Sequence, residues 1–359
     1  MSLLKFEKRY YVKIDGRRYR IVQIGRQWWT TSDLMLTADS GNTEFYSEAD
    51  RVYFASANVF PDEWRMCSDN DIRMLGNCTA PNTSYALRSI SGWSTGEEGG
   101  DLYCFNAEPK GYYNKSGVLS EVGVAAFIRR GDGNGHYWLT PSKSDFQYWG
   151  GDSNTTYYRF PIRLCKDATV NIGGRDYPTT KIGNQIWLAE NLDLKWDGLT
   201  MKSPVEITEA AGWYFDNDEI TYGVNGNKYG ILYNWYALSG IESRIPTGWR
   251  VPTKEDWDSL ILHIDRSTTA LKSTTKWLDG PTGTDMYGFT AYPSGVHYNT
   301  TGYNDRFDYK GYTAIYWSKT QDTSNVDFAY AEINDAVPAP ETDIRDKRRG
   351  FAVRLVMDA

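Results

Sequence analysis

The chain has 359 residues, of which 40% are hydrophobic and 24% charged, and its formal net charge is −7. An acidic chain offers no positive field to a phosphate backbone, which argues against nucleic acid as a partner. No stretch approaches the roughly 18 consecutive apolar residues that cross a bilayer, so we expect no membrane insertion. Aromatic residues reach 15% beside 33 glycines, a balance typical of short strands joined by turns.

The first part of the sequence is repeated in the second. Residues 12–34 align with residues 170–192 (170 − 12 = 192 − 34 = 158), and ten of the 23 positions are identical. Residues 86–111 align with residues 270–295 (270 − 86 = 184), with twelve identities in 26 positions. Chance would give about one or two identities in such a window. The sequence therefore predicts a tandem duplication with two domains, 1–166 and 167–359.

Local patterns predict the elements of copy one in chain order. Ser32–Leu36, like its counterpart Leu188–Leu194 in copy two, favours a short helix. Ser68 has the character of a helix N-cap, with Ile72 and Leu75 following at helical spacing.

The next two elements are a strand and a second helix. Within Asp101–Gly111 the residues shared with copy two fall on alternate positions, the period of a strand. Thr253, followed by Glu255 and Asp256, predicts a helix start in copy two. Its apolar residues recur at helical spacing, namely Trp257, Leu260, Ile261 and Ile264. Each domain is thus predicted to be α+β, with short antiparallel strands, small helices and long loops.

Aromatic residues fall into a duplicated and an unduplicated set. We interpret the duplicated tryptophans as core residues, in the pairs Trp29/Trp187, Trp64/Trp249, Trp93/Trp277 and Trp138/Trp317. Unduplicated aromatic residues are better candidates for stacking on sugars, namely Tyr148, Trp149, Tyr298 and Tyr303.

The residues that bind metals are sparse. All four cysteines lie in copy one, namely Cys67, Cys78, Cys104 and Cys165, so the architecture shared by the two copies cannot depend on disulfides. The four cysteines could form two disulfides in any of three pairings, but we favour free or partly paired thiols. Without a CxxC pair, and with three histidines, we expect no zinc site. Asp216–Glu219 fits an acidic turn better than a calcium loop. We expect no metal and no cofactor.

Copy two carries ordered motifs of a known family. They read IGNQIWLAENL, YGILYNWYAL, IPTGWRVPTKEDWDSL, GTDMYGFTAYPSG, IYWSKT and GFAVRLV. In this order they resemble the Fibrobacter succinogenes major paralogous domain, over nearly all of copy two and more faintly in copy one. That family is similar to the C-type-lectin-like fold. The resemblance therefore implies two tandem lectin-like domains with adjacent termini and adaptable loops.

The resemblance also points to display on surfaces of Bacteroidetes or their phages. Residues 1–16 show no export signal, so we expect a non-enzymatic binding or structural module on a phage virion, as a fibre, spike or decoration protein. The expected partners are other virion or surface proteins and a host-surface glycan or protein, with homo-oligomer formation open. The alternative is an extracellular adhesin or lipoprotein fragment on a bacterial cell surface.

A carbohydrate-active enzyme is the second alternative. No Gly-x-Ser-x-Gly elbow, HExxH helix or phosphate-binding glycine loop occurs in the sequence. A glycosidase needs only two carboxylates, and 46 aspartates and glutamates offer many pairs. Nothing singles one pair out, so we expect no catalysis.

The candidate ligand site lies near the end of copy two. Copy one has 22 residues between Trp138 and Phe160 (160 − 138), and copy two has 34 between Trp317 and Phe351 (351 − 317). The twelve extra residues, including the stretch 335–343, predict a long loop of the kind that carries function. Packing against copy one or another subunit is an equal alternative. The candidate ligand contacts are Tyr316, Lys319, Gln321, Asp327, Tyr330, Glu332 and Asn334. The following run RDKRR (345–349) is interpreted as a solvated face.

Overall fold

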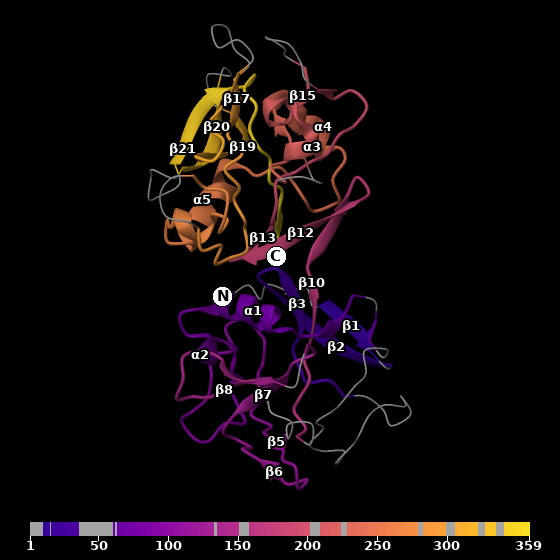
Figure 1. Cartoon of the computed structure of the whole chain (residues 1–359), viewed down its shortest axis with the longest axis vertical. Helices are drawn as coiled ribbons and strands as arrows, with labels where there is room; N and C mark the ends of the chain where they lie inside the picture. Colours follow the sequence, from indigo (N-terminus) through magenta and orange to yellow (C-terminus); the bar gives the residue numbers. More distant parts are fainter. Residues whose placement is uncertain are drawn as a thin grey trace, which may run out of the picture. The chain divides into compact units, whose positions relative to one another are not determined.

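The computed structural model describes most of the chain. The described residues are 10–14, 16–35, 60–61, 63–132, 135–150, 158–201, 209–223, 228–278, 283–298, 306–321, 327–334 and 341–359, with backbone alone for 327–334 and 341–344. The chain forms two compact units, Met1–Ala168 and Thr169–Ala359. Figure 1 labels their elements, and strands predominate over a few short helices. The α+β class predicted from the sequence is confirmed.

Unit 1 combines short strands with two helices. Its strands are β1 (Tyr10–Ile14), β2 (Arg17–Ile24), β3 (Gln27–Thr30), β4 (Arg65–Met66), β5 (Tyr112–Tyr113), β6 (Leu119–Ser120), β7 (Ala126–Arg129), β8 (His136–Leu139), β9 (Gln147–Trp149) and β10 (Leu164–Asp167). Its helices are α1 (Asp69–Thr79) and α2 (Thr83–Leu87).

Unit 2 has the same kinds of element in a similar order. Its strands are β11 (Thr169–Ile172), β12 (Arg175–Ile182), β13 (Gln185–Leu188), β14 (Thr200–Met201), β15 (Ala211–Trp213), β16 (Leu232–Tyr233), β17 (Val296–Tyr298), β18 (Arg306–Asp308), β19 (Thr313–Gln321), β20 (Asp327–Asn334), β21 (Glu341–Asp346) and β22 (Val356–Asp358). Its helices are α3 (Glu219–Tyr222), α4 (Leu238–Glu242) and α5 (Lys254–His263), with 3-10 turns η4 (Phe215–Asn217), η5 (Trp235–Ala237) and η6 (Thr268–Ala270).

In each unit the beginning and the end of the chain share a sheet. Unit 1 has the strand order β1–β2–β3–β10–β4, and unit 2 has β11–β12–β13–β22. The closing strand is antiparallel to the third strand in both, with Cys165 opposite Trp29 and Val356 opposite Trp187. Both tryptophans are fully buried, which confirms their predicted core role.

A buried arginine joins three distant segments in each unit. Arg163 Nε donates to Asp33 Oδ1 at 2.7 Å, and its other nitrogens donate to the carbonyl oxygens of Thr30, Phe105 and Asn106. In unit 2, Arg354 Nε donates to Asn191 Oδ1 at 2.9 Å, and its other nitrogens donate to the carbonyl oxygens of Leu188, Phe289 and Thr290. Every partner in one unit occupies the aligned position in the other. The guanidinium thus ties the opening hairpin, the central loop and the closing segment together.

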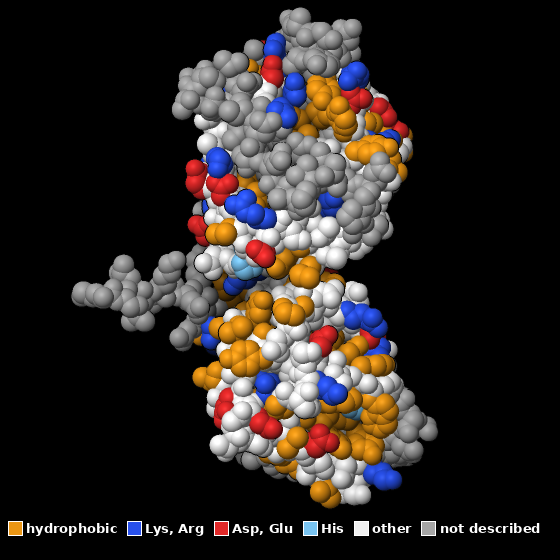
Figure 2. All heavy atoms as spheres, turned by 90° about the vertical axis from the view of Figure 1, so that its left-hand side faces the viewer, with side chains coloured by type: hydrophobic (Ala, Val, Ile, Leu, Met, Phe, Trp, Pro, Cys, Tyr) orange, Lys and Arg blue, Asp and Glu red, His pale blue; other side chains and the backbone are white. Residues whose placement is uncertain are grey.

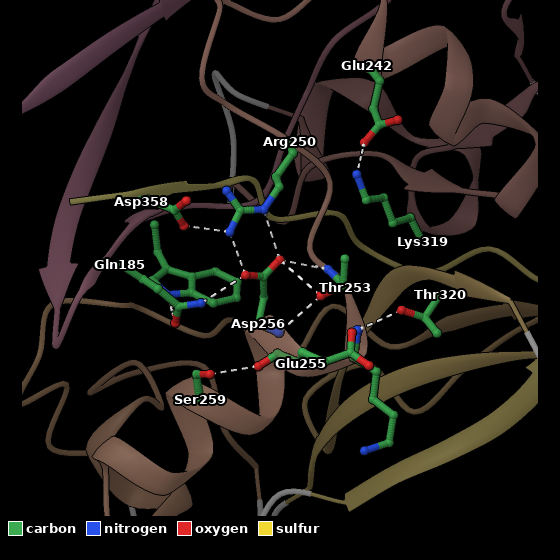
Figure 3. Close-up of polar contacts among 12 residues, drawn as sticks. Gln185, Glu242, Arg250, Thr253, Glu255, Asp256, Ser259, Lys319, Thr320 and Asp358 are labelled. Carbon is green, nitrogen blue, oxygen red and sulfur yellow. Dashed lines mark hydrogen bonds and ion pairs between the residues drawn. The ribbon is translucent and has the colours of Figure 1, made fainter. Parts of the chain in front are cut away.

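A second network fixes the longer helix of each unit. Asp256 in α5 accepts hydrogen bonds from Gln185 Nε2 (3.0 Å), Arg250 Nη2 (2.6 Å) and the Thr253 backbone (2.9 Å), and Arg250 also pairs with Asp358 (Figure 3). Thr253 and Asp256 form a capping box, so the predicted helix start is confirmed. The equivalent side chains in unit 1 make the same contacts around α1, namely Gln27, Arg65, Ser68, Asp71 and Asp167.

The predicted short helices near the start of each copy are wrong. Within Ser32–Leu36, Leu34 N donates to Ile162 O at 2.8 Å, and within Leu188–Leu194, Leu192 N donates to Val353 O at 2.9 Å. These N–H groups bond to the closing segment of their own unit, so they do not form helical i to i−4 bonds. Residue 36 lies outside the described residues.

The predicted strand Asp101–Gly111 is also wrong. Asp101 and Asn106 both have positive φ (42° and 54°), and Asn106 N donates to Asp101 Oδ1 at 2.7 Å. The carboxylate closes a tight turn, so the alternate identities mark buried or turn positions. Phe105 and Ala107, two of these shared residues, are buried in the core.

The last sheet of each unit is an antiparallel meander, β7–β8–β9 in unit 1 and β19–β20–β21 in unit 2 (Figure 1). The strands β7 and β19 bond to the same part of the closing segment. Arg129 N donates to Pro161 O at 2.9 Å, and Trp317 N donates to Ala352 O at 3.1 Å. Arg129, and not Trp138, is therefore the structural counterpart of Trp317.

When Arg129 is taken as the counterpart of Trp317, copy two has no twelve-residue insertion, so that expectation is wrong. From Arg129 to Phe160 unit 1 has 31 residues (160 − 129), and from Trp317 to Phe351 unit 2 has 34 (351 − 317). The difference is three residues. Part of the predicted loop is strand, because Glu341–Asp346 form β21, while residues 335–340 lie outside the described residues.

The buried arginines generate a stability prediction. Arg163→Met leaves the Asp33 carboxylate buried without its guanidinium partner, so we expect unit 1 to lose about 3–5 kcal/mol of unfolding free energy. Arg354→Met should cost unit 2 less, because Asn191 is neutral. Urea unfolding of each variant measures the loss. Adding Asp33→Leu to Arg163→Met should recover part of it. Equal losses in the two units would contradict the account.

Candidate functional site

The predicted ligand residues of unit 2 do not all reach solvent. Tyr316 is fully buried, and its ring stacks on Trp257 with centroids 5.4 Å apart and meets Phe289 edge-on. Burial raises the pKa of the Tyr316 phenol. Tyr316 is therefore a core residue and cannot contact a ligand at the surface, which corrects its place in the candidate site.

The other predicted contacts lie on β19 and β20. Lys319 Nζ pairs with Glu242 in α4 at 3.0 Å (Figure 3). Gln321 is exposed at the end of β19. The remaining four lie on β20, where the backbone alone is described, namely Asp327, Tyr330, Glu332 and Asn334. All six residues thus lie on two adjacent strands of one meander sheet, where the sequence predicted a loop. The structure does not describe the side chains of the four residues on β20.

The three strands of the corresponding meander of unit 1 are described with their side chains, and they carry an aromatic face. Its rings touch with centroid separations between 3.9 and 6.3 Å. The members of this aromatic face are Tyr112, Phe127, His136, Trp138, Trp149, Tyr158 and Phe160. Figure 2 shows hydrophobic side chains gathered on the surface of unit 1, the lower part of the view.

Trp149 is the exposed ring of this face. It is 41% exposed, and its neighbour Tyr148 on β9 is 48% exposed. Because successive strand residues point to opposite sides, Trp149 contacts His136 whereas Tyr148 contacts Tyr137. A half-exposed indole on a rigid strand has the flat apolar surface and the free edge that recognition of a sugar ring requires.

A buried histidine supports the aromatic face from below. His136 is 4% exposed, its ring stacks on Phe160 at 3.9 Å, and its Nδ1 has no hydrogen-bond partner among the described residues. Burial, with the neighbouring charge of Arg129, lowers its pKa to about 4. The imidazole is therefore neutral at pH 7 and packs as an aromatic ring.

Polar groups lie beside Tyr148, on the side of β9 opposite to Trp149. Arg130 donates from Nη1 to the Tyr148 hydroxyl at 2.5 Å and from Nε to Asp132 at 2.8 Å. Asp132 in turn accepts from the backbone N of Asp69 at the start of α1 (3.1 Å). The Arg130-Gly131-Asp132 tripeptide is thus tied to the helix and to Tyr148, and it holds the arginine beside the exposed tyrosine.

No group of three His, Cys, Asp or Glu side chains in the described part of the chain is placed to hold a metal ion. No disulfide joins the four cysteines, and Cys67 and Cys165 are buried. Asp218 caps α3 and Glu219 pairs with Lys195, so the acidic turn predicted for Asp216–Glu219 is confirmed. No helix among the described residues has the length and apolarity of a membrane span.

These features define a class of protein: an α+β chain of two units that repeat one set of buried contacts. Residues 180–357, nearly all of unit 2, match the model of the Fibrobacter succinogenes major domain. The family predicted for copy two is confirmed. No curated protein and no solved structure matches the chain.

The buried histidine generates a pH prediction. An unfolded histidine takes up a proton near pH 6.5 and His136 near pH 4, so the unfolded state binds more protons between these values. We expect unit 1 to lose about 3 kcal/mol of stability as the pH falls from 6.5 to 4. Urea unfolding at several pH values tests this, and His136→Phe should flatten the profile in that window. An unchanged slope in the variant would refute the assignment.

Proposed function

We propose that the chain is a non-enzymatic glycan-binding module made of two tandem lectin-like domains. The exposed Trp149 on the aromatic face carries this proposal, because its ring packs edge-on against His136 and stands on the stacked rings beneath it. Support for the tandem arrangement comes from the buried arginines Arg163 and Arg354, whose hydrogen-bond partners occupy aligned positions in the two units.

A face of this kind suits binding better than catalysis. Aromatic rings supply apolar contact area at a low cost in side-chain entropy, and Arg130, on the opposite side of β9, supplies directional donors beside Tyr148. The carboxylate beside them, Asp132, is held by Arg130 and by the backbone of Asp69. Both interactions lower the pKa of Asp132, with the Arg130 hydrogen bond the main cause, which makes it a poor general acid.

Replacing the exposed indole tests the proposal. A glycan array first identifies a ligand, and Trp149→Ala should then weaken its binding at least about tenfold, since exposed aromatic anchors carry much of the energy of such contacts. Tyr85→Ala is the matched control, because Tyr85 is 45% exposed but lies on α2, outside the aromatic face. The bound glycan should be recovered with its length unchanged. Equal affinity of Trp149→Ala and the unsubstituted chain would refute the site, and shortened glycan would favour an enzyme.

The setting we propose is display on a phage virion, with a host-surface glycan as the contact. The surface-display role that the resemblance of copy two implies is the support for display in general. Mass spectrometry of purified particles and of peptides shaved from intact cells tests the setting. We expect peptides of this chain in the particles. Their recovery from shaved cells alone would favour the adhesin.

A further inference from the structure

The end of β21 brings cations and aromatic rings together in unit 2. Backbone contacts bring these residues together. An antiparallel bridge joins His297 to Gly350 and so sets Tyr298 beside Arg349. Trp235 N donates to Lys347 O at 2.9 Å. We call these residues the arginine–aromatic patch, which consists of Trp235, Tyr298, Arg306, Lys347, Arg348 and Arg349.

Two guanidinium groups lie against one ring. Arg349 Cζ is 4.9 Å from the centroid of the Tyr298 ring, and Arg306 Cζ is 5.6 Å from it. Lys347 Nζ lies 4.9 Å from the Trp235 ring. Such stacking fixes the direction of a guanidinium while leaving its N–H edge available to an acceptor.

The cations of the patch are unequally neutralised. Arg306 pairs with Asp308, and Arg348 pairs with Asp346 at 2.6 Å. Arg349 forms no ion pair within the described part of the chain, and its Nε is buried without a hydrogen-bond partner there. A buried donor left unsatisfied is costly, which favours an acceptor supplied by a ligand.

The charge of the patch is opposite to that of the chain. Among the side chains that the structure describes there, four cations (Arg306, Lys347, Arg348 and Arg349) accompany two carboxylates (Asp308 and Asp346), a balance of +2 in a chain of net charge −7. We propose that the arginine–aromatic patch binds the carboxylate or sulfate groups of an acidic polysaccharide, with Arg349 as the main donor. The choice of a polysaccharide rests on the proposed glycan-binding function, whereas the anion site stands on the contacts above.

Calorimetric titration of the whole chain tests this proposal. The probes are polygalacturonate for carboxylates, dextran sulfate for sulfates, neutral dextran and inorganic sulfate. We expect a polyanion to bind, neutral dextran not to bind at this site, and Arg349→Gln to weaken polyanion binding at least about tenfold. Binding should also weaken with added salt, since screening reduces the attraction.

Control variants separate the site from general charge and from unit 1. Arg244→Gln removes the same charge from unit 2 at an exposed arginine that stacks on Trp196 at 5.1 Å and lies outside the patch, so it should bind as the unsubstituted chain does. Trp149→Ala should leave polyanion binding intact. If Arg349→Gln fails to melt cooperatively, Tyr298→Leu removes the ring behind the guanidinium and should weaken binding in the same way.

The outcomes are distinguishable. Polyanion binding that survives Arg349→Gln and Tyr298→Leu, or that falls equally in Arg244→Gln, overturns the anion site. Binding of inorganic sulfate alone overturns the polysaccharide as its carrier. Loss of polyanion binding in Trp149→Ala would move the ligand to unit 1 and refute the proposal for unit 2, while loss of neutral-glycan binding in Trp149→Ala bears on the proposed function alone.

Discussion

The buried guanidinium of each unit is the interaction on which the rest of the fold depends. Arg163 and Arg354 reach the opening hairpin, the central loop and the closing segment at once, and almost every acceptor is a backbone carbonyl. Backbone acceptors place few demands on side chains, so the loops can vary in sequence while keeping their positions. The one side-chain acceptor differs, Asp33 in unit 1 and Asn191 in unit 2. In unit 2 the buried arginine therefore has a neutral amide in place of the carboxylate, and burial lowers the pKa of Arg354 although the charge of Glu190 acts in the opposite direction.

The two candidate sites stand on this frame in different ways. The meander sheet of unit 1 presents an aromatic face with Trp149 exposed, whereas the sheet of unit 2 ends beside the arginine–aromatic patch. Neither site contains a residue to which the buried arginine of its unit donates a hydrogen bond. Stacked rings and paired charges hold each site, so its geometry exists before a ligand arrives, which limits the entropy lost on binding.

How much of this the sequence could predict depended on the range of each interaction. The capping box joins Thr253 to Asp256, three residues along the chain, and the sequence predicts it. The sequence also predicts that Trp187 is a core residue. The region 188–194 was misassigned as helix, because its N–H groups are committed to residues far along the chain, such as Val353. The alignment of Trp138 with Trp317 is wrong, because the two tryptophans stand in similar short motifs but on strands that are not equivalent, β8 and β19. Trp149 was detectable as an unduplicated aromatic residue. Arg349 was not, because its ring partner Tyr298 lies 51 residues away (349 − 298).

The strand order of the first sheet also bears on how such units spread between genes. The chain enters each unit at one edge of the sheet and leaves by a strand three places away, β1 against β10 and β11 against β22. Entry and exit are thus about 15 Å apart, three strand spacings. A segment with ends this near can be spliced into a surface loop of an unrelated protein, or copied end to end, without stretching its host. Near ends of this kind allow one unit to be followed directly by another, as Thr169 follows Ala168 in this chain.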